Sequence, residues 1–367
     1  MNYHDVPLLF SESFHSTDML YLTGFWVHDA FLAFKIGSQS YGLLSALERS
    51  RAQKESHLKH VLSLEEWLIE VSQKIGHRAE LADVVAALQE HFKIESFCLP
   101  RDFPAWLLLG LQKRKIKFKL AEGTLFPEQN QKQPPAIQEL RKANDLVRLC
   151  FKHVEAILEE SEITNDQTLT YRNEILTSEF VRKEIEALCL KHDALGDCIV
   201  AGGDQACDPH CKGSGPLKAQ EWIVVDIFPR LKTTGYHGDM TRTFIKGNPT
   251  EAQQALYEAV KLAQQEALST LKAGVPFKAP HEAAQKTFEK LGYQTDIKAN
   301  PPIGFIHSTG HGLGLALHEP ISLSHRSEGL LEMGMVVTVE PGLYYPGLGG
   351  VRIEDVALIT AKGYEIL

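Results

Sequence analysis

Several segments of the chain carry apolar residues at intervals of three and four positions, the pattern of a helix that buries one face. The clearest such segment is 136–160, whose apolar face is formed by Leu140, Ala143, Leu146, Val147, Cys150 and Val154. The same pattern predicts helices over 81–92, 178–192, 250–272 and 280–291. The last two segments are followed by glycine or proline, which are typical helix stop signals.

Shorter apolar runs predict strands. In the first part of the chain they cover 30–36 and 41–44, and in the second part they cover 198–201, 222–227, 240–245, 336–340 and 351–359. Helices precede most strands in the second part, which favours an α+β fold with helices packed on a largely antiparallel sheet. The alternation of short strands and a helix in the first part favours a smaller α/β domain.

A polar segment separates these two parts. Residues 122–135 lack a sustained apolar period and end in two adjacent prolines, as interdomain linkers often do. We therefore expect an N-terminal domain over 1–130 and a catalytic domain over 131–367.

Composition and charge narrow the class of protein. With 38 Lys+Arg against 47 Asp+Glu the formal charge is −9, which argues against binding to a nucleic-acid backbone. No apolar run approaches the roughly 18 residues of a membrane span, so no membrane partner is expected. The first residues include Asp5 and do not resemble a signal peptide, and the six cysteines are too sparse for a disulfide framework. These features predict a cytoplasmic protein with reduced thiols.

Five acidic or imidazole side chains lie at the ends or edges of predicted strands in the second part: Asp226, Asp239, His311, Glu340 and Glu354. Considered singly, the two aspartates fit turns or solvated strand ends, and Glu354 fits an ion pair with Arg352 two residues away. Glu340 directly follows an apolar strand, where an unpaired buried carboxylate would be costly, so it requires a cation.

The histidines of this part are unusually dense. His307, His311 and His318 fall within twelve residues, and glycines on both sides of His311 allow the backbone to approach a bound group closely. A flexible surface loop is the alternative. The spacing does not match the helical HExxH zinc motif, because Thr309, Gly310 and Gly312 disfavour a helix.

Taken together, four carboxylates and one imidazole form an oxygen-rich donor set that suits two hard or borderline divalent ions. The charges of the acids and of two such ions balance. Ions about 3.5–4 Å apart can share a water that becomes hydroxide near neutral pH. The donor set therefore predicts metal-assisted hydrolysis.

The ordered blocks around these residues resemble the pita-bread metallopeptidases, the family of methionine aminopeptidase, aminopeptidase P and prolidase. The matching blocks are Asp226, 235–243, 307–314 with His318-Glu319, 339–342 and 349–355. The resemblance implies that Asp226, Asp239, His311, Glu340 and Glu354 are the metal ligands. It also implies that Asp239 and Glu354 bridge both ions, that Asp226 completes one site, and that His311 and Glu340 complete the other.

The resemblance further implies roles in catalysis and substrate binding. Glu340 would accept the proton of the attacking water, and His210 and His318 would contact the substrate and act on the oxyanion or the leaving nitrogen. His307 is a further substrate-binding candidate, and Arg352 resembles the proline-selective branch. The interval of 13 residues from Asp226 to Asp239 is longer than the family pattern, and we expect 230–234 to loop out.

The N-terminal residues Tyr21-Leu22-Thr23-Gly24-Phe25 resemble the family's creatinase-type domain. The whole pattern predicts a hydrolase that cleaves the Xaa-Pro bond at the N-terminus of dipeptides or short peptides. Mn²⁺ is the expected ion, with Co²⁺ or Zn²⁺ as alternatives, and a homodimer is expected. The alternatives are a non-catalytic binding module and a creatinase-like hydrolase. The sequence leaves prolidase and aminopeptidase P equally open.

Overall fold

The computed structural model describes residues 3–367, and the chain divides into two compact units, Met1–Gln129 and Asn130–Leu367. In the N-terminal unit six strands form one mixed sheet in the order β4-β3-β2-β1-β5-β6. The elements are β1 (Val6–Ser11), α1 (Thr17–Thr23), β2 (Phe31–Ile36), β3 (Gln39–Leu44), α2 (Ala46–Glu55), β4 (His60–Ser63), α3 (Leu64–Ile75), α4 (Leu81–His91), β5 (Phe97–Leu99), α5 (Ala105–Lys113) and β6 (Phe118–Leu120).

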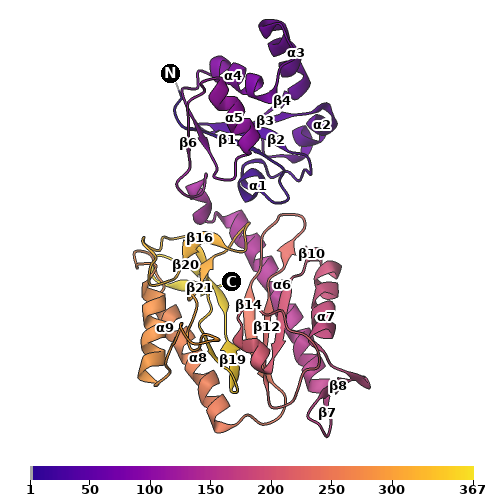
Figure 1. Cartoon of the computed structure of the whole chain (residues 1–367), viewed down its shortest axis with the longest axis vertical. Helices are drawn as coiled ribbons and strands as arrows, with labels where there is room; N and C mark the ends of the chain where they lie inside the picture. Colours follow the sequence, from indigo (N-terminus) through magenta and orange to yellow (C-terminus); the bar gives the residue numbers. More distant parts are fainter. Residues whose placement is uncertain (1–2) are drawn as a thin grey trace. The chain divides into compact units, whose positions relative to one another are not determined.

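The C-terminal unit begins with the longest helix among the described residues, α6, and ends in antiparallel strands (Figure 1). Its elements are α6 (Pro134–Glu160), β7 (Glu162–Ile163), β8 (Leu169–Tyr171), β9 (Glu174–Ile175), α7 (Ser178–Lys191), β10 (Ala194–Leu195), β11 (Cys198–Gly202), β12 (Trp222–Ile227), β13 (Arg230–Leu231), β14 (Met240–Ile245), α8 (Glu251–Ser269), α9 (Ala279–Lys290), β15 (His311–Gly312), β16 (Glu319–Ser322), β17 (Val336–Val339), β18 (Gly342–Tyr345), β19 (Gly349–Arg352), β20 (Asp355–Ile359) and β21 (Tyr364–Ile366).

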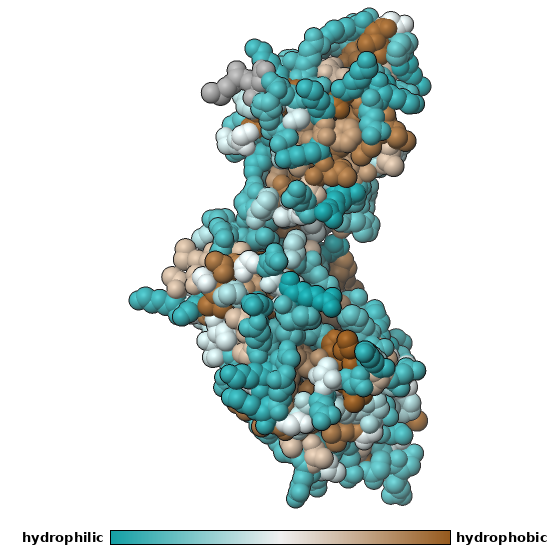
Figure 2. Space-filling model, turned by 60° about the vertical axis from the view of Figure 1, so that its left-hand side comes forward, coloured by the Kyte–Doolittle hydropathy of each residue, from teal (hydrophilic) through white to brown (hydrophobic). Residues whose placement is uncertain are grey.

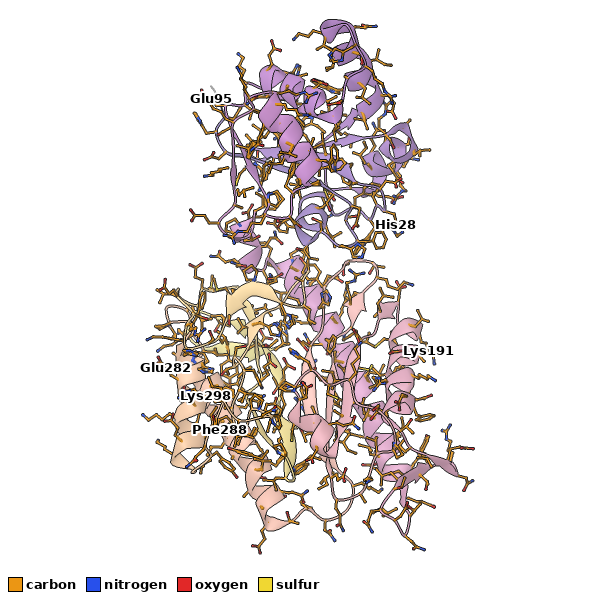
Figure 3. All side chains as sticks on the ribbon, viewed as in Figure 1. His28, Glu95, Lys191, Glu282, Phe288 and Lys298 are labelled. Carbon is orange, nitrogen blue, oxygen red and sulfur yellow. The ribbon has the colours of Figure 1, made fainter. Side chains whose placement is uncertain are left out.

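Two sets of strands in this unit each have their own covering helices. The sheet β11-β12-β14 shares a core with α6 and α7, whereas β17, β19 and β20 share a core with α8 and α9. In Figure 1 these helix pairs lie on opposite sides of the strands. Phe288 of α9, labelled in Figure 3, is 2% exposed and packs edge-on against Phe305, with 5.2 Å between ring centroids. The described strand pairs of the unit are antiparallel, and the predicted α+β architecture is confirmed.

One predicted element is wrong. The segment 351–359 does not form a single strand, because β19 ends at Arg352 and β20 begins at Asp355 in a different ladder. Glu354 lies in the break, where its backbone N–H donates to the carbonyl of Thr241 at 3.1 Å. Arg352 and Glu354 therefore do not lie on the same face of one continuous strand, as an ion pair two residues apart would require.

The face that Figure 2 shows is mostly hydrophilic, and its largest gathering of hydrophobic residues lies over the N-terminal unit. Within residues 3–367 no helix combines the length and the apolar character that crossing a bilayer requires.

Candidate metal centre

Strand register brings the two predicted aspartates to one end of the sheet β11-β12-β14. In the antiparallel pair of β12 and β14, Asp226 lies opposite Thr241 and Ile227 opposite Met240, so Asp239 lies just beyond the last pair. The intervening residues leave this ladder, and Arg230–Leu231 form β13, which pairs with β10. The long interval between the aspartates is thus absorbed in a hairpin loop, as expected, although part of that loop pairs as a strand.

Asp239 is positioned by α6. The backbone N–H of Asp239 donates to Oδ1 of Asn144, a fully buried residue, at 3.2 Å. A Cβ atom at Gly238 would lie 2.7 Å from the backbone of Ala143, so only glycine lets this segment approach the helix so closely. The glycine of the Gly-Asp pair therefore has a packing function beside the ligand candidate.

His311 and Glu340 are linked through one threonine. The Oγ1 atom of Thr338 accepts from the backbone N–H of His311 at 3.0 Å and donates to Oε1 of Glu340 at 3.3 Å. Gly310 packs on the same strand, since a Cβ there would lie 1.9 Å from the carbonyl oxygen of Thr338. The glycine beside the imidazole thus serves close backbone packing of β17 rather than loop flexibility.

Glu354 is held by β14 from the other half of the unit. Besides the backbone contact with Thr241, its Oε2 atom accepts from the Oγ1 hydroxyl of that threonine at 2.8 Å. The side chain is almost fully buried, at 2% exposure. This places a carboxylate that follows β19 next to the aspartate that precedes β14.

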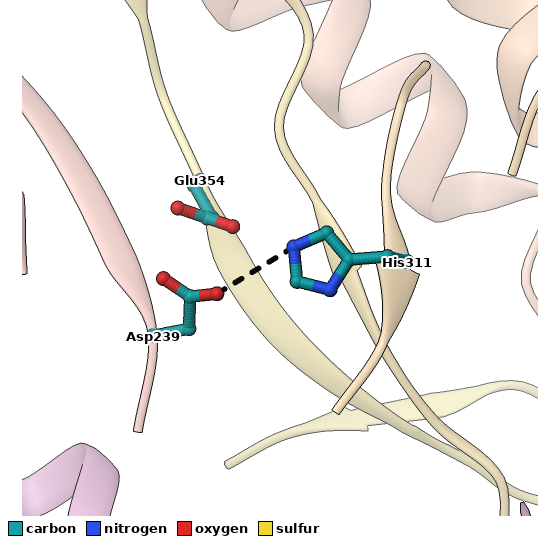
Figure 4. Close-up of side chains that lie close together, drawn as sticks. All are labelled: Asp239, His311 and Glu354. Carbon is teal, nitrogen blue, oxygen red and sulfur yellow. Dashed lines mark ion pairs between the residues drawn. The ribbon is translucent and has the colours of Figure 1, made fainter. Parts of the chain in front are cut away.

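Three side chains now converge. One donor atom each from Asp239, His311 and Glu354 lies within 4.8 Å of the others. Figure 4 shows the three side chains close together. The Nε2 atom of His311 is 3.6 Å from Oδ2 of Asp239 and 3.4 Å from Oε1 of Glu340. Such a group matches the donor spacing that a bound cation requires.

The electrostatics of the group favour a cation. Burial, together with the charge of neighbouring acids, raises the pKa of Asp239 and of Glu354 well above the usual range of carboxyl groups. Burial raises the pKa of Glu340 to about 7, with a further contribution from Asp226. Burial lowers the pKa of His311 to about 4, so its imidazole is neutral at pH 7 and can bind a metal.

Asp226 lies at the edge of this group and contacts Arg352. Its Oδ2 atom is 2.8 Å from Nη2 of Arg352, whereas its buried Oδ1 atom has no hydrogen-bond partner among the described residues. Burial by itself lowers the pKa of Arg352, but Tyr344, Asp226 and Glu340 together raise it above the usual value. The ion pair suggested for Arg352 and Glu354 is thus replaced by a pair with Asp226.

These observations test whether the residues present suit a divalent ion. Buried carboxylates that repel one another and an unpartnered buried oxygen are costly unless a cation compensates them. Four carboxylates and one neutral imidazole provide suitable ligands for such an ion. The site therefore fits divalent metal ions.

The group opens into a cavity of about 540 Å³. Every residue proposed for the site contributes to its lining, and these residues are His210, Asp226, Asp239, His307, His311, His318, Glu340, Arg352 and Glu354. The rings of His311 and His318 lie 4.3 Å apart and nearly perpendicular. His210 and His318 are accessible on the cavity wall, where solutes can reach them.

The polar contacts around His307 include residues that the sequence did not single out. Its Nε2 atom lies 2.8 Å from the hydroxyl of Tyr344, which in turn accepts from Nη1 of Arg352 at 3.1 Å. Burial lowers the pKa of His307 to about 3, and Arg352 acts in the same direction. Thr241 and Thr243 alternate along β14 and contact Glu354 and the backbone of Arg352, respectively, so this alternation is a usable signal. Nothing in the local sequence marks Tyr344 or Asn144.

Comparisons with known proteins identify the family. The model of metallopeptidase family M24 matches residues 138–361. An uncharacterized peptidase of Staphylococcus aureus is 34% identical over 245 residues, which span 66% of this chain and 64% of that protein. The Xaa-Pro dipeptidase of Pyrococcus furiosus is 33% identical over 260 residues, which span 67% of this chain and 72% of that protein.

The fold comparison agrees. The prolidase of Pyrococcus horikoshii OT3 has a TM-score of 0.78 at 27% identity, with 99% of this chain and 93% of that chain covered. The predicted resemblance to pita-bread metallopeptidases is thus confirmed. The chain belongs to metallopeptidase family M24.

Proposed function

We propose that this protein is a metallopeptidase that cleaves the Xaa-Pro bond at the N-terminus of dipeptides or short peptides. The observation that carries the proposal is a cavity in which a buried acidic cluster, Arg352 and four histidines face one space. The similarity to an Xaa-Pro dipeptidase and a prolidase supports the same substrate class.

Membership of the family implies divalent metal ions, and we propose two, with Mn²⁺ as the native ion. Asp239 and Glu354 would contact both ions, Asp226 would complete one site, and His311 with Glu340 would complete the other. Carboxylate ligands in this number favour Mn²⁺ over softer ions. When bound, the ions would polarise the scissile carbonyl as Lewis acids and lower the pKa of a water molecule, so that it can lose a proton and attack the carbonyl as hydroxide.

The protein's own groups then move the protons. Glu340 lies in the cavity beside His311, and we propose that it accepts a proton from the attacking water and releases it again. His318, at the cavity wall beside His311, is placed to donate to the oxyanion or to the leaving nitrogen. His210 lines the same cavity, and we propose that it contacts the substrate together with His307.

Proline selectivity is expected from the chemistry of the imide bond. Proline has no backbone N–H and a fixed φ, so a cavity shaped to its ring can exclude ordinary residues by steric fit and by leaving their N–H unpaired. Arg352 is held rigidly by Asp226 and Tyr344, which suits a fixed contact at the substrate. We propose that it contributes to the selection of proline.

The test compares Ala-Pro with Ala-Ala in protein reconstituted with Mn²⁺. We expect kcat/KM to be at least about 10²-fold higher for Ala-Pro, because the discrimination combines fit and an unpaired donor. A chelator should abolish hydrolysis, and added Mn²⁺ should restore it. Equal kcat/KM for both dipeptides would contradict proline selectivity, and full activity without metal would contradict the metal chemistry.

A second substrate pair separates the two enzyme types that the sequence left open. Ala-Pro and Ala-Pro-Gly present the same scissile bond, but only the second carries a residue after the proline. A dipeptidase hydrolyses the first and excludes the second, whereas an aminopeptidase accepts both. A protein that binds Mn²⁺ but hydrolyses neither peptide would favour a binding module.

We also propose a creatinase-type N-terminal domain, a homodimer and a cytoplasmic location. Trp106 and Leu109 on α5 are 58% and 55% exposed, which supports self-association of the N-terminal unit. All six cysteines lie among the described residues as free thiols, which suits a reducing compartment. Sedimentation analysis at several concentrations tests the dimer.

A further inference from the structure

A buried ion pair lies outside the proposed ligand set. Lys132 Nζ contacts the carboxylate of Glu319, and the two side chains are only 4% and 7% exposed. Burial lowers the pKa of Lys132, an effect that Glu319 opposes in part. Buried ion pairs are costly to desolvate and contribute little net stability compared with packed apolar side chains, so stability gives no sufficient reason for this pair.

Glu319 closes the loop that carries His318. It is the first residue of β16 and lies opposite Gly312 of β15, while its Oε1 atom accepts from the backbone N–H of Leu315 at 3.2 Å. The loop is packed tightly around this carboxylate, because a Cβ at Gly314 would lie 1.9 Å from the same oxygen. The carboxylate therefore fixes both ends of a loop that begins next to His311.

Lys132 is itself fixed by backbone contacts. Its N–H donates to the carbonyl of Gly334 at 2.7 Å, and the neighbouring Gln131 forms a β-bridge with Met335 just before β17. The ammonium group thus reaches Glu319 from a backbone segment that is attached to the strand leading to Glu340. Both ends of the ion pair are anchored independently of His318.

We propose that Lys132 is a positioning residue, whose ion pair with Glu319 holds the loop 312–319 so that the His318 imidazole faces the reacting bond. This inference rests on the function proposed above, in which His318 donates to the oxyanion or the leaving nitrogen. Lys132 does not line the cavity, so it acts through Glu319 and the loop.

The experiment replaces Lys132 by methionine, which keeps the length of the side chain but removes the charge. We expect kcat for Ala-Pro to fall by about 10- to 100-fold, the scale of misplacing one catalytic group, while KM and bound Mn²⁺ stay within about twofold of wild type. In the double variant K132M/E319Q no buried charge is left unpaired, and the glutamine side chain can still accept from the N–H of Leu315. We expect its kcat to lie between those of K132M and wild type.

Lys246→Met is the matched control. Lys246 donates to the carbonyl groups of Leu158 and Glu159 at the other end of α6, at 2.7 and 2.9 Å. Its loss should lower the unfolding temperature and leave kcat unchanged. A kcat for K132M within about twofold of wild type would overturn the proposal, as would a loss of activity that is matched by an equal loss of bound metal.

A second readout does not depend on activity. In protein labelled with ¹⁵N-histidine and loaded with diamagnetic Zn²⁺, the His318 ring signals are assigned by their loss in H318Q. We expect these signals to shift in K132M and not in K246M, and unchanged signals would overturn the proposal. If K132M does not fold, K132M/E319Q is judged by the same criteria. An inactive wild type would refute the proposed function, whereas this spectrum would still decide the role of Lys132.

Discussion

At Asp239, burial and neighbouring charge act on the same carboxyl group. The side chain is nearly inaccessible, and after burial the charges of Asp226 and Glu340 are the main causes of its raised pKa. A raised pKa means that the folded protein disfavours the ionised form, so ionisation at neutral pH destabilises the metal-free protein. The same charge attracts a cation. The ionised carboxylate therefore increases the affinity for metal and lowers the stability of the metal-free protein.

We therefore expect Asp239→Asn to have opposite effects on activity and on metal-free stability. The variant should lose Xaa-Pro hydrolysis by about 10³-fold or more, because a predicted ligand of both ions is replaced by a neutral group. Its metal-free form should unfold at a higher temperature than the metal-free wild type at pH 7.5. Thermal unfolding with and without Mn²⁺ measures both metal-free stability and the response to the ion, and a peptidase assay measures the loss of hydrolysis.

Asp145→Asn is the control for this comparison. Asp145 lies on α6, its side chain is 73% exposed, and its surface ion pair with Arg148 should contribute little. This variant should match wild type in hydrolysis and in the response to Mn²⁺. If Mn²⁺ raised the unfolding temperature of Asp239→Asn by as much as that of wild type, Asp239 would not hold the ion.

A residue could be predicted as a metal donor from the sequence where its immediate neighbours in the chain already imply burial. Glu340 follows an apolar strand, and this position already required a cation before any partner was known. The partner of Arg352 could not be predicted, because Asp226 lies 126 positions away on a strand of a different sheet. The same reason hides the contact between Tyr344 and His307.

Among the elements, periodic apolar patterns predict the positions of helices better than they predict where strands end. The predicted helix over 136–160 is α6, Pro134–Glu160, and the predicted strands 222–227 and 240–245 match β12 and β14. The break between β19 and β20 was missed because it is caused by a hydrogen bond from Glu354 to a distant strand. Local patterns carry no information on such pairings.

The segment that precedes β14 contacts α6 closely, with Gly238 against the backbone of Ala143. In Gly238→Ala the new methyl group would meet the Ala143 backbone at 2.7 Å and push Asp239 away from Asn144. We expect the free energy of unfolding to fall by about 1–3 kcal/mol, the usual cost of overpacking. Bound Mn²⁺ should fall in parallel.

Gly363→Ala is the matched substitution, because a Cβ there would meet nothing within 4 Å and the backbone conformation suits any residue. It should leave both stability and metal binding unchanged. Equal Mn²⁺ affinity in Gly238→Ala and wild type, measured by calorimetry, would show that the ligand does not depend on this packing.

For the whole C-terminal unit, the proposed ligands connect two cores. Asp226 lies in β12 and Asp239 just before β14, strands that pack with α6 and α7, whereas Glu340 and Glu354 adjoin strands that pack with α8 and α9. A cation held by all of them would bind the folded arrangement and not the unfolded chain. Its binding free energy should therefore add to the stability of the unit as a whole.

The pH dependence of stability tests this linkage. Glu340, Asp239 and Glu354 have raised pKa values, so each contributes stability that is fully present only below its ordinary pKa, 3.8 for the aspartate and 4.5 for the glutamates. This stability is lost as pH rises through the folded pKa, about 7 for Glu340. His311 has a lowered pKa of about 4 and reduces stability only below its unfolded value near 6.5. Between pH 6.5 and 8 the acids therefore dominate the site's contribution.

We expect the metal-free protein to unfold at a lower temperature at pH 8 than at pH 6.5, by about 2–4 °C for each kcal/mol lost. The increase in unfolding temperature caused by Mn²⁺ should be larger at pH 8, because protons no longer compete for the carboxylates. Calorimetry in buffers of equal ionic strength provides the measurement. A Mn²⁺ effect that is independent of pH would show that the ion binds elsewhere.

The spread of the ligand set along the chain also affects biosynthesis. From Asp226 to Glu354 the ribosome must add 128 residues, which at 5–20 residues per second takes roughly 6–26 s. During that time the nascent chain holds its first two aspartates without the later donors. Ion capture at the full set of proposed ligands is therefore delayed until this stretch has left the ribosome.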